Sequence, residues 1–282
     1  MEIKGILREQ GFRFKKNFGQ NFLTDDRLLS SIAEVGCGET AEAVLEIGSG
    51  AGTLTRMLSQ KAKKVVAMEI DRTLAPVLEK TLCGCGNVRV VFADVMKTPM
   101  REIEEMLGGD FALVANLPYY ITTPVLMKFI EQSTRVKSLT VMVQKEVALR
   151  LCAEAGTPDY GAITAAIGAV ADATITAEVP RTMFYPVPNV DSAVVHIVMK
   201  PDKYGEYPQK TYRDVVRAAF TSRRKTLVNN LMTSLKLSRQ QAEESVIAIG
   251  QDVKVRGEQL SPEAFVRLAK VLDGTLRAIQ EK

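Results

Sequence analysis

Short apolar runs alternate with helical stretches along the chain from about residue 43. Five apolar runs of six to eight residues are expected to be buried strands, at 43–48, 64–71, 88–94, 111–118 and 138–144. Amphipathic segments such as 72–83 and 124–132 separate them and predict helices. Because a parallel connection needs a crossover, this alternation predicts βαβ units and a parallel sheet.

The pattern changes after about residue 172. Two strand-like runs, 173–181 and 192–200, are joined by a link too short for a helical crossover, which predicts an antiparallel pair at the sheet edge. A polar linker follows at 201–209, and beyond it the chain has helical patterns without convincing strands. The sequence therefore predicts an α/β domain over 1–205 with a mostly parallel, seven-stranded sheet, and a small all-α domain over 206–282.

Composition narrows the class of protein. The 282 residues are 46% hydrophobic and 25% charged, as in ordinary globular chains. No apolar stretch approaches the ~20 residues of a membrane span, and the N-terminus lacks the apolar core of a signal peptide. The four cysteines and single histidine do not form the clusters of a zinc site, so no metal is expected. Free thiols fit a reducing cytoplasm, and we expect a soluble cytoplasmic protein.

The net charge of +4 is unevenly distributed. The N-terminal arm, 1–20, has five basic and two acidic side chains, and 200–282 has sixteen basic and ten acidic ones. The part between them is net acidic. Basic ends suggest a polyanionic partner, although solvated charge on helices would give the same pattern.

A glycine-rich turn, Glu46 to Gly52, follows the first expected strand. Its spacing is G-x-G-x-G, which differs from the dinucleotide-binding G-x-G-x-x-G. Such a turn lets the backbone approach a ligand, and the helix behind it presents free N–H groups. Glu69 ends the next strand, where a carboxylate accepts hydrogen bonds from ribose hydroxyls. The turn favours a methyltransferase over a nicotinamide enzyme, and both remain open on this evidence.

The third strand ends in Asp94, which could accept a hydrogen bond from an adenine amine. By itself Asp94 could equally cap the turn that follows. Together with Glu46, Gly48 and Glu69, each at the end of a strand, it indicates a nucleoside lying across the carboxyl ends of parallel strands.

The fourth strand leads into Asn116-Leu117-Pro118-Tyr119. A plain turn would also use Asn and Pro. The chemical interpretation is that the Asn116 side-chain oxygen and a carbonyl just before or at Pro118 accept the two N–H groups of an adenine N6 amine. Those bonds would draw the nitrogen toward tetrahedral geometry and free its lone pair. Tyr119 would offer a ring on which the base stacks, a contact worth about 1–3 kcal/mol.

Six features occur in order: KKNFGQNFL, EIGSGAGTLT, Glu69, Asp94, NLPYYITTPVL and MFYPVPNVDSAVV. Together they closely resemble the ribosomal RNA adenine N6,N6-dimethyltransferase family, in its small-subunit branch, over about residues 12–230. The resemblance implies a Rossmann-like class I S-adenosylmethionine-dependent methyltransferase fold, with S-adenosylmethionine as donor and S-adenosylhomocysteine as product. It also implies the substrate, two adjacent adenosines in the 3′-terminal hairpin loop of 16S rRNA in the small (30S) ribosomal subunit, and a role in small-subunit biogenesis.

The resemblance implies the site residues as well. Six would bind the cofactor: Asn21, Leu23, Gly48, Glu69, Asp94 and Asn116. Gly48 would face the methionine part, Glu69 the ribose and Asp94 the adenine.

The substrate residues implied by the resemblance are Asn116, Leu117, Pro118, Tyr119 and Phe184. Tyr119 and Phe184 would sandwich the target base. Leu117 matches the small-subunit branch, whereas Ile is commoner there in the large-subunit, antibiotic-resistance branch.

An enzyme that modifies a base needs that base unstacked, and loops supply it at low cost. RNA affinity would then come from phosphate contacts. The candidates are Arg13, Lys15, Lys16, Arg223, Arg224 and Lys225, with the all-α domain docking on the subunit and the protein acting as a monomer. A solvated helix start would also explain Arg223–Lys225.

Three alternatives remain beside this interpretation. A 23S rRNA methyltransferase of the large-subunit branch would use the same chemistry, but Leu117 and the separate C-terminal domain argue against it. An assembly factor acting mainly by binding is compatible with the sequence. A nicotinamide-dependent oxidoreductase is disfavoured by the glycine spacing and by NLPY.

Overall fold

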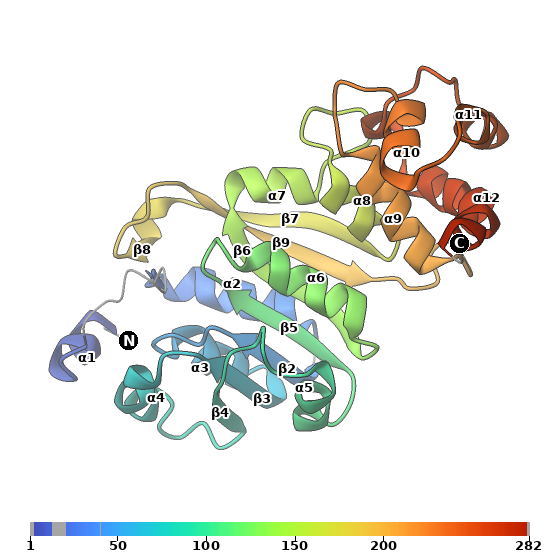
Figure 1. Ribbon diagram of the computed structural model, residues 1–282. Helices are drawn as coiled ribbons and strands as arrows, with labels where there is room; N and C mark the ends of the chain where they lie inside the picture. Colours follow the sequence, from blue (N-terminus) through green and yellow to red (C-terminus); the bar gives the residue numbers. More distant parts are fainter. Residues whose placement is uncertain (1–2, 13–20, 40, 281–282) are drawn as a thin grey trace. The chain divides into compact units, whose positions relative to one another are not determined.

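The computed structural model describes residues 3–12, 21–39 and 41–280 (Figure 1). The helices are α1 (Ile3–Glu9), α2 (Asp26–Cys37), α3 (Thr53–Ser59), α4 (Ala75–Thr81), α5 (Met100–Leu107), α6 (Thr122–Gln132), α7 (Lys145–Leu151), α8 (Ala162–Gly168), α9 (Gln209–Ala219), α10 (Leu227–Leu235), α11 (Arg239–Ala248) and α12 (Pro262–Gln280). The strands are β1 (Phe22–Leu23), β2 (Ala41–Ile47), β3 (Ala62–Glu69), β4 (Val88–Phe92), β5 (Phe111–Asn116), β6 (Val136–Gln144), β7 (Ala171–Val179), β8 (Phe184–Tyr185) and β9 (Ser192–Met199). Short 3₁₀ turns lie at Arg72–Leu74, Arg181–Met183 and Gly257–Gln259.

Seven strands form one sheet in the order β4-β3-β2-β5-β6-β9-β7. The neighbours from β4 to β6 are parallel, and β9 is antiparallel to β6. Thr174 Oγ1 donates to His196 O and Thr176 Oγ1 to Val194 O, so residue numbers rise along β7 as they fall along β9. The predicted α/β fold, with a mostly parallel sheet of seven strands, is confirmed, including the antiparallel edge.

Helices cover both faces of this sheet (Figure 1). Leu29 of α2 and Leu58 of α3 pack with Val114 of β5 in one apolar cluster. On the other face, Phe129 of α6 meets Phe111 of β5 edge-on, with ring centroids 6.3 Å apart. Strands covered on both sides are continuous apolar runs, which is why the sequence shows them so clearly.

A separate two-stranded ribbon joins distant parts of the chain. Phe22 of β1 pairs with Tyr185 of β8, and Leu23 pairs with Phe184, in antiparallel register. Next to the ribbon, the Thr24 backbone N–H and hydroxyl both donate to the carbonyl of Met183, at 3.1 Å each.

The chain divides into two compact units. The first comprises 1–148 and 174–199 and contains the sheet except for the first three residues of β7; the second comprises 149–173 and 200–282. In the second unit, Tyr160 donates to the Leu260 carbonyl at 2.8 Å. Its ring lies 5.9 Å from that of Phe220.

The predicted domains, 1–205 and 206–282, differ from these units in two respects, the first being that the boundary lies at residue 200 and not at 206. The contacts group 149–173 with the C-terminal helices, whereas the sequence interpretation leaves that segment in the α/β domain. As folding domains, 1–205 and 206–282 stay a prediction. Within the described part of 200–280 the regular elements are all helical. None of the described helices combines the length and apolar character needed to cross a membrane.

Candidate nucleoside-cofactor site

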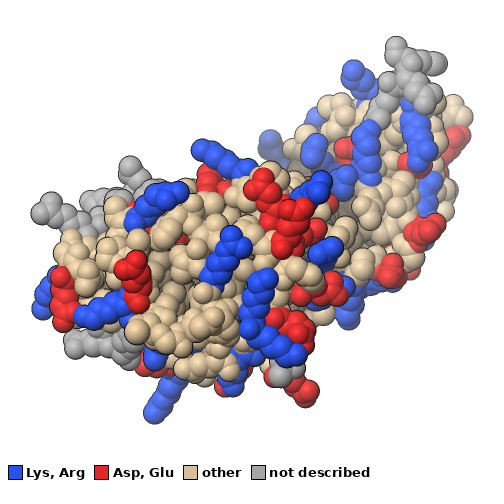
Figure 2. Space-filling view, turned by 90° about the horizontal axis from the view of Figure 1, so that it is seen from below, with Lys and Arg blue, Asp and Glu red and all other residues tan. Residues whose placement is uncertain are grey.

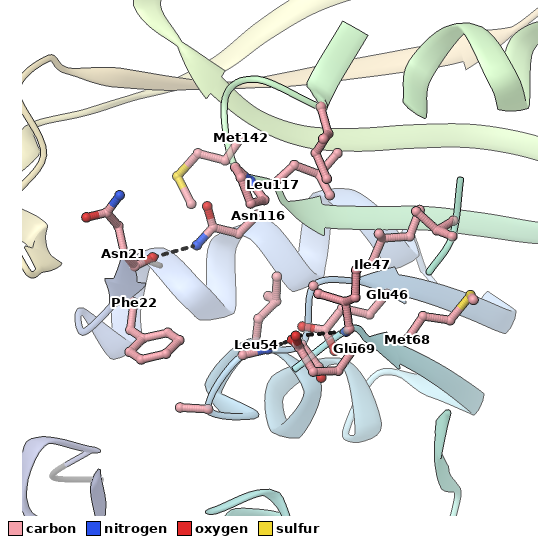
Figure 3. Close-up of a pocket in the computed structure, with 18 of the residues that line it drawn as sticks. Asn21, Phe22, Glu46, Ile47, Leu54, Met68, Glu69, Asn116, Leu117 and Met142 are labelled. Carbon is pink, nitrogen blue, oxygen red and sulfur yellow. Dashed lines mark hydrogen bonds between the residues drawn. The ribbon is translucent and has the colours of Figure 1, made fainter. Parts of the chain in front are cut away.

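The carboxyl ends of β2, β3, β4 and β5 surround a cavity of about 280 Å³ in the first unit (Figure 3). All ten residues predicted to contact cofactor or substrate line it: Asn21, Leu23, Gly48, Glu69, Asp94, Asn116, Leu117, Pro118, Tyr119 and Phe184. Parallel strands bring their carboxyl ends to one edge, so side chains distant in sequence converge there.

The glycine turn follows β2 and curls over the end of β3. Gly48 and Gly50 have φ of 75° and 55°, the left-handed region that favours glycine. The Gly48 N–H donates to Met68 O at 2.8 Å. A Cβ atom on Gly50 would lie 2.8 Å from the Phe22 ring, so this position also has no room for a side chain.

Glu69 is held by the backbone around it. Its Oε1 accepts from the N–H groups of Ile70 and Asp71, at 2.9 and 2.8 Å, and Oε2 accepts from Gly50 N at 2.8 Å (Figure 3). Burial raises the pKa of Glu69, and these three N–H bonds oppose the shift. Since a carboxylate oxygen accepts about two bonds, Oε2 retains one acceptor position.

Glu46 is a second carboxylate in the cavity wall, outside the residues predicted to bind cofactor. It is 1% exposed at the end of β2, and its Oε2 has no hydrogen-bond partner among the described residues. Burial raises the pKa of Glu46 to about 8, and the nearby charge of Glu69 adds to the shift. Its position at a strand end was visible in the sequence; its burial and the vacant acceptor were not.

Asp94 begins a tight turn after β4. Its Oδ1 accepts from Met96 N at 2.9 Å, and its main-chain carbonyl accepts from Thr98 N at 2.9 Å. One carboxylate oxygen of Asp94, Oδ1, therefore caps the turn, as the alternative interpretation of the sequence predicts. Lys97 Nζ lies 3.8 Å from Oδ2, and the charge of Lys128 also acts on the Asp94 carboxylate.

The turn after β5 is shaped by its own hydrogen bonds. The Asn116 amide nitrogen donates to Asn21 O at 3.4 Å, which turns Oδ1 to the opposite side of the amide (Figure 3). The Pro118 carbonyl accepts from Ile121 N at 3.1 Å and from Thr122 Oγ1 at 3.3 Å, so both of its acceptor positions are filled. Of the two carbonyls the sequence left open, that of Leu117 accepts no hydrogen bond from the residues that the structure describes, so it is the better candidate to bind a ligand.

Two aromatic side chains predicted to hold the base lie in the same wall. The Tyr119 hydroxyl is 2.9 Å from Ser192 Oγ, and this contact fixes the position of its ring. Phe184 is buried in the apolar cluster that contains Leu23 and Met142.

Sequence reasoning missed much of the apolar lining. These residues are Phe22, Leu29, Leu54, Met68, Ile70, Leu74, Val95, Met96, Tyr120, Ile121 and Met142. In sequence they resemble ordinary core or loop residues, and no local pattern marks them as lining a cavity.

The predicted phosphate contacts fall into two groups. Arg13, Lys15 and Lys16 lie outside the described residues. The others, 223–225, form a loop between α9 and α10 in the second unit, far along the chain from the cavity residues.

The Arg223 side chain connects this loop to the segment that contains Pro158 and Tyr160. Its guanidinium donates to the carbonyls of Pro158 and Tyr160, at 3.2 Å each. Arg224 and Lys225 are exposed. On the face in Figure 2, Lys and Arg are interspersed with Asp and Glu. Among the described residues, no group of three or more His, Cys, Asp and Glu is placed to hold a metal ion.

The strand order, the glycine turn and the carboxylates at the ends of β3 and β4 define a class I methyltransferase fold. Solved structures similar to this chain include a dimethyladenosine transferase from Plasmodium falciparum, with a TM-score of 0.74 and 24% identity over 90% of this chain and 98% of that one. The 23S rRNA methyltransferase ErmE has a TM-score of 0.68 and 29% identity over 89% of this chain and 99% of its own.

Sequence comparisons give the family. The family model described as ribosomal RNA adenine dimethylase matches residues 11–273. The ribosomal RNA small subunit methyltransferase A of Bacillus cereus (strain B4264) is 44% identical over 281 residues, covering 95% of this chain and 94% of the relative. Its counterpart in Bacillus anthracis (strain CDC 684 / NRRL 3495) matches equally. The chain belongs to the ribosomal RNA adenine dimethylase family, a family of S-adenosylmethionine-dependent methyltransferases.

Proposed function

We propose that this protein transfers methyl groups from S-adenosylmethionine to N6 of two adjacent adenosines in the 3′-terminal hairpin loop of 16S rRNA, giving N6,N6-dimethyladenosines. The observation that carries the chemistry is the convergence of the predicted cofactor and substrate residues on one cavity. The choice of the small subunit is supported by relatives named small subunit methyltransferase A at 44% identity, against 29% for ErmE.

The vacant polar atoms of the cavity fit the cofactor. Glu69 Oε2 would accept from a ribose hydroxyl, and Asp94 Oδ2 from the adenine amine. Gly48 would leave room for the methionine part, bordered by Asn21 and Leu23. When bound, S-adenosylmethionine supplies an electrophilic methyl group, and the protein's task is to hold it and the target amine in line.

Asn116 and Leu117 would hold the target amine. Asn116 Oδ1 and the Leu117 carbonyl are acceptors for its two N–H groups, and accepting both lets the nitrogen lone pair point toward the donor. Tyr119 would stack on the base, with its ring fixed through Ser192, and Phe184 would close the other side. No strong base is needed before attack, since the proton leaves afterwards.

RNA would be held through phosphates by the N-terminal arm and by the loop that contains Arg224 and Lys225. A folded small subunit, with the hairpin loop already open, is the expected partner, and the protein would act as a monomer in the cytoplasm. Unpairing is then supplied by the substrate rather than by the enzyme.

The test is methyl transfer from labelled S-adenosylmethionine to small subunits that lack this modification, followed by mass spectrometry of the nucleosides. Dimethyladenosine in the 3′-terminal hairpin is expected. Label in 23S rRNA alone would assign the protein to the large-subunit branch, and binding of subunits without transfer would favour an assembly factor.

The variant Asn116→Ala tests the role given to Asn116. We expect transfer to be lost while subunit binding is retained, because the substitution removes an acceptor for the amine and leaves the predicted phosphate contacts unchanged. Transfer at the rate of the unsubstituted protein would contradict the role given to Asn116.

A further inference from the structure

Lys128 lies on α6, the helix that begins just after the Asn116–Tyr119 turn. The residue is 8% exposed. Its Nζ donates to the carbonyls of Val95 at 2.6 Å, Met96 at 3.4 Å and Thr98 at 2.6 Å. An ammonium group has three donors, so each of them has a backbone acceptor here.

These three carbonyls belong to the turn that positions Asp94. The Asp94 carbonyl accepts from both the N–H and the hydroxyl of Thr98, at 2.9 Å each, and its Oδ1 accepts from Met96 N. Within this turn the side chains of Met96 and Lys97 are exposed and that of Val95 is buried. Lys128 is thus a direct tie between this turn and the body of the first unit.

We propose that Lys128 is a positioning residue that holds the Asp94 turn in the conformation that binds the adenine of the cofactor. This inference rests on the proposed function. Because α6 starts at the turn that would hold the target amine, one helix fixes both the amine acceptors and the adenine-binding turn. Loss of the ammonium group leaves three carbonyls without their donor, and the turn would relax to hydrate them.

An electrostatic role for the lysine is distinguishable from a positioning role. Lys97 is also in this turn, with Nζ 3.8 Å from Asp94 Oδ2, but its side chain is 86% exposed. Lys97→Met therefore removes a charge close to Asp94 while leaving the carbonyl contacts of Lys128 in place. It is the matched control.

The experiment measures the Kd of S-adenosylmethionine by calorimetry for the unsubstituted protein and for Lys128→Met, Lys97→Met, Asp94→Asn and the double variant Asp94→Asn/Lys128→Met. Lys128→Met is expected to weaken binding about tenfold or more, as expected when buried polar groups lose a partner. Lys97→Met should change it less than threefold. If Lys128 acts through Asp94, the double variant binds about as weakly as Asp94→Asn alone.

Steady-state methylation adds a second readout. The KM for S-adenosylmethionine should rise in Lys128→Met, while kcat at saturating donor changes less. Lys128→Arg keeps the positive charge and several donors, so it should recover part of the affinity. If Lys128→Met does not fold, Lys128→Gln replaces it, because a shorter side chain with two donors still fails to reach three carbonyls.

Unchanged affinity in a folded Lys128→Met or Lys128→Gln protein overturns the inference, as does strict additivity with Asp94→Asn. These results leave the proposed function standing provided the unsubstituted protein binds S-adenosylmethionine. Failure of the unsubstituted protein to bind it would instead refute the proposed function.

Discussion

At the scale of single residues, the candidate site is a set of polar groups at strand ends. Gly48, Glu69, Asp94 and Asn116 were predictable because each lies at the end of an apolar run, and parallel strands bring such positions together. The hydrogen-bond acceptor positions that each of these groups keeps for a ligand were not predictable. That depends on backbone donors such as Gly50 N on Glu69, which only the folded turn defines.

Glu46 gives a prediction on pH. Its pKa is raised by burial from 4.5 to about 8, so between those values the folded protein binds more protons than the unfolded chain. The free energy of unfolding should therefore fall as pH rises from about 5 to about 8, by at most about 1.4 kcal/mol per pH unit. Glu46→Gln should make this slope shallower, the remainder including the contribution of Glu69, whose pKa is also raised by burial. Urea unfolding of the ligand-free protein over a pH series measures the slope.

Glu42→Gln on the same strand is the control, because the Glu42 side chain is 72% exposed. It should retain the slope of the unsubstituted protein. Parallel pH profiles for the unsubstituted protein and Glu46→Gln would show that Glu46 is charged in the folded state.

At the scale of elements, the strands were easier to predict than the helices. All five parallel strands and the edge pair were expected within a few residues of where they lie. The signal is clearest for β2, β3, β5 and β6, whose mostly buried residues form apolar runs, whereas β4 and β7 are largely half-buried or exposed. Helices α1, α2, α5, α8 and α11 were not separately predicted. Of these, α5 and α8 have only eight and seven residues, whereas α2 has 12. Helix α11 is preceded by a capping box formed by Ser238 and Gln241, a start signal that hydrophobic periodicity does not reveal.

The two-residue strands β1 and β8 were not predicted from the sequence. Neither has a periodicity of its own, and each is a strand only because the other pairs with it. The same is true of the segment 149–173, whose membership of the second unit follows from tertiary contacts.

The glycine turn after β2 supplies a prediction for an element. Gly50→Ala places a Cβ at a φ of 55° and 2.8 Å from the Phe22 ring, so it should cost about 1–3 kcal/mol of stability. It should also weaken S-adenosylmethionine binding, because the Gly50 N–H would move from Glu69. Thermal unfolding and calorimetry measure the two effects.

Gly86→Ala is the matched substitution, because a Cβ there meets no atom within 4 Å and the φ of Gly86 is outside the left-handed region. A change within about 0.5 kcal/mol is expected for it. Equal effects at the two glycines would show that the turn after β2 tolerates a side chain.

At the scale of the whole molecule, charge is the property that the sequence and the structure describe differently. The sequence shows basic ends, but on the face in Figure 2 both signs are mixed, and Arg223 is partly engaged in bonding Pro158 and Tyr160. A substitution at Arg223 would confuse RNA binding with folding of the second unit. Arg224 and Lys225 are the cleaner test.

Arg224→Glu/Lys225→Glu should lower the affinity for small subunits and make its dependence on salt shallower, by about one unit of slope for each phosphate that the variant no longer neutralises. Filter binding over a series of salt concentrations measures both quantities. Lys63→Glu/Lys137→Glu makes the same change in net charge at exposed positions of the first unit and should have a smaller effect. Equal weakening in the two double variants would mean that only net charge matters.

The ribbon of β1 and β8 has a consequence for the protein's own synthesis. Residues 21–23 leave the ribosome early, but their partners at 184–185 follow only after most of the first unit has been made. Until then a nascent chain has the glycine turn and the strand ends, but it lacks the part of the cavity wall that Phe184 supplies. Because closing so long a loop is slow compared with local folding, the cavity should be among the last parts of the first unit to form. Cofactor retention would thus mark completion of this unit, and a chain released before Phe184 would lack one side of its binding site.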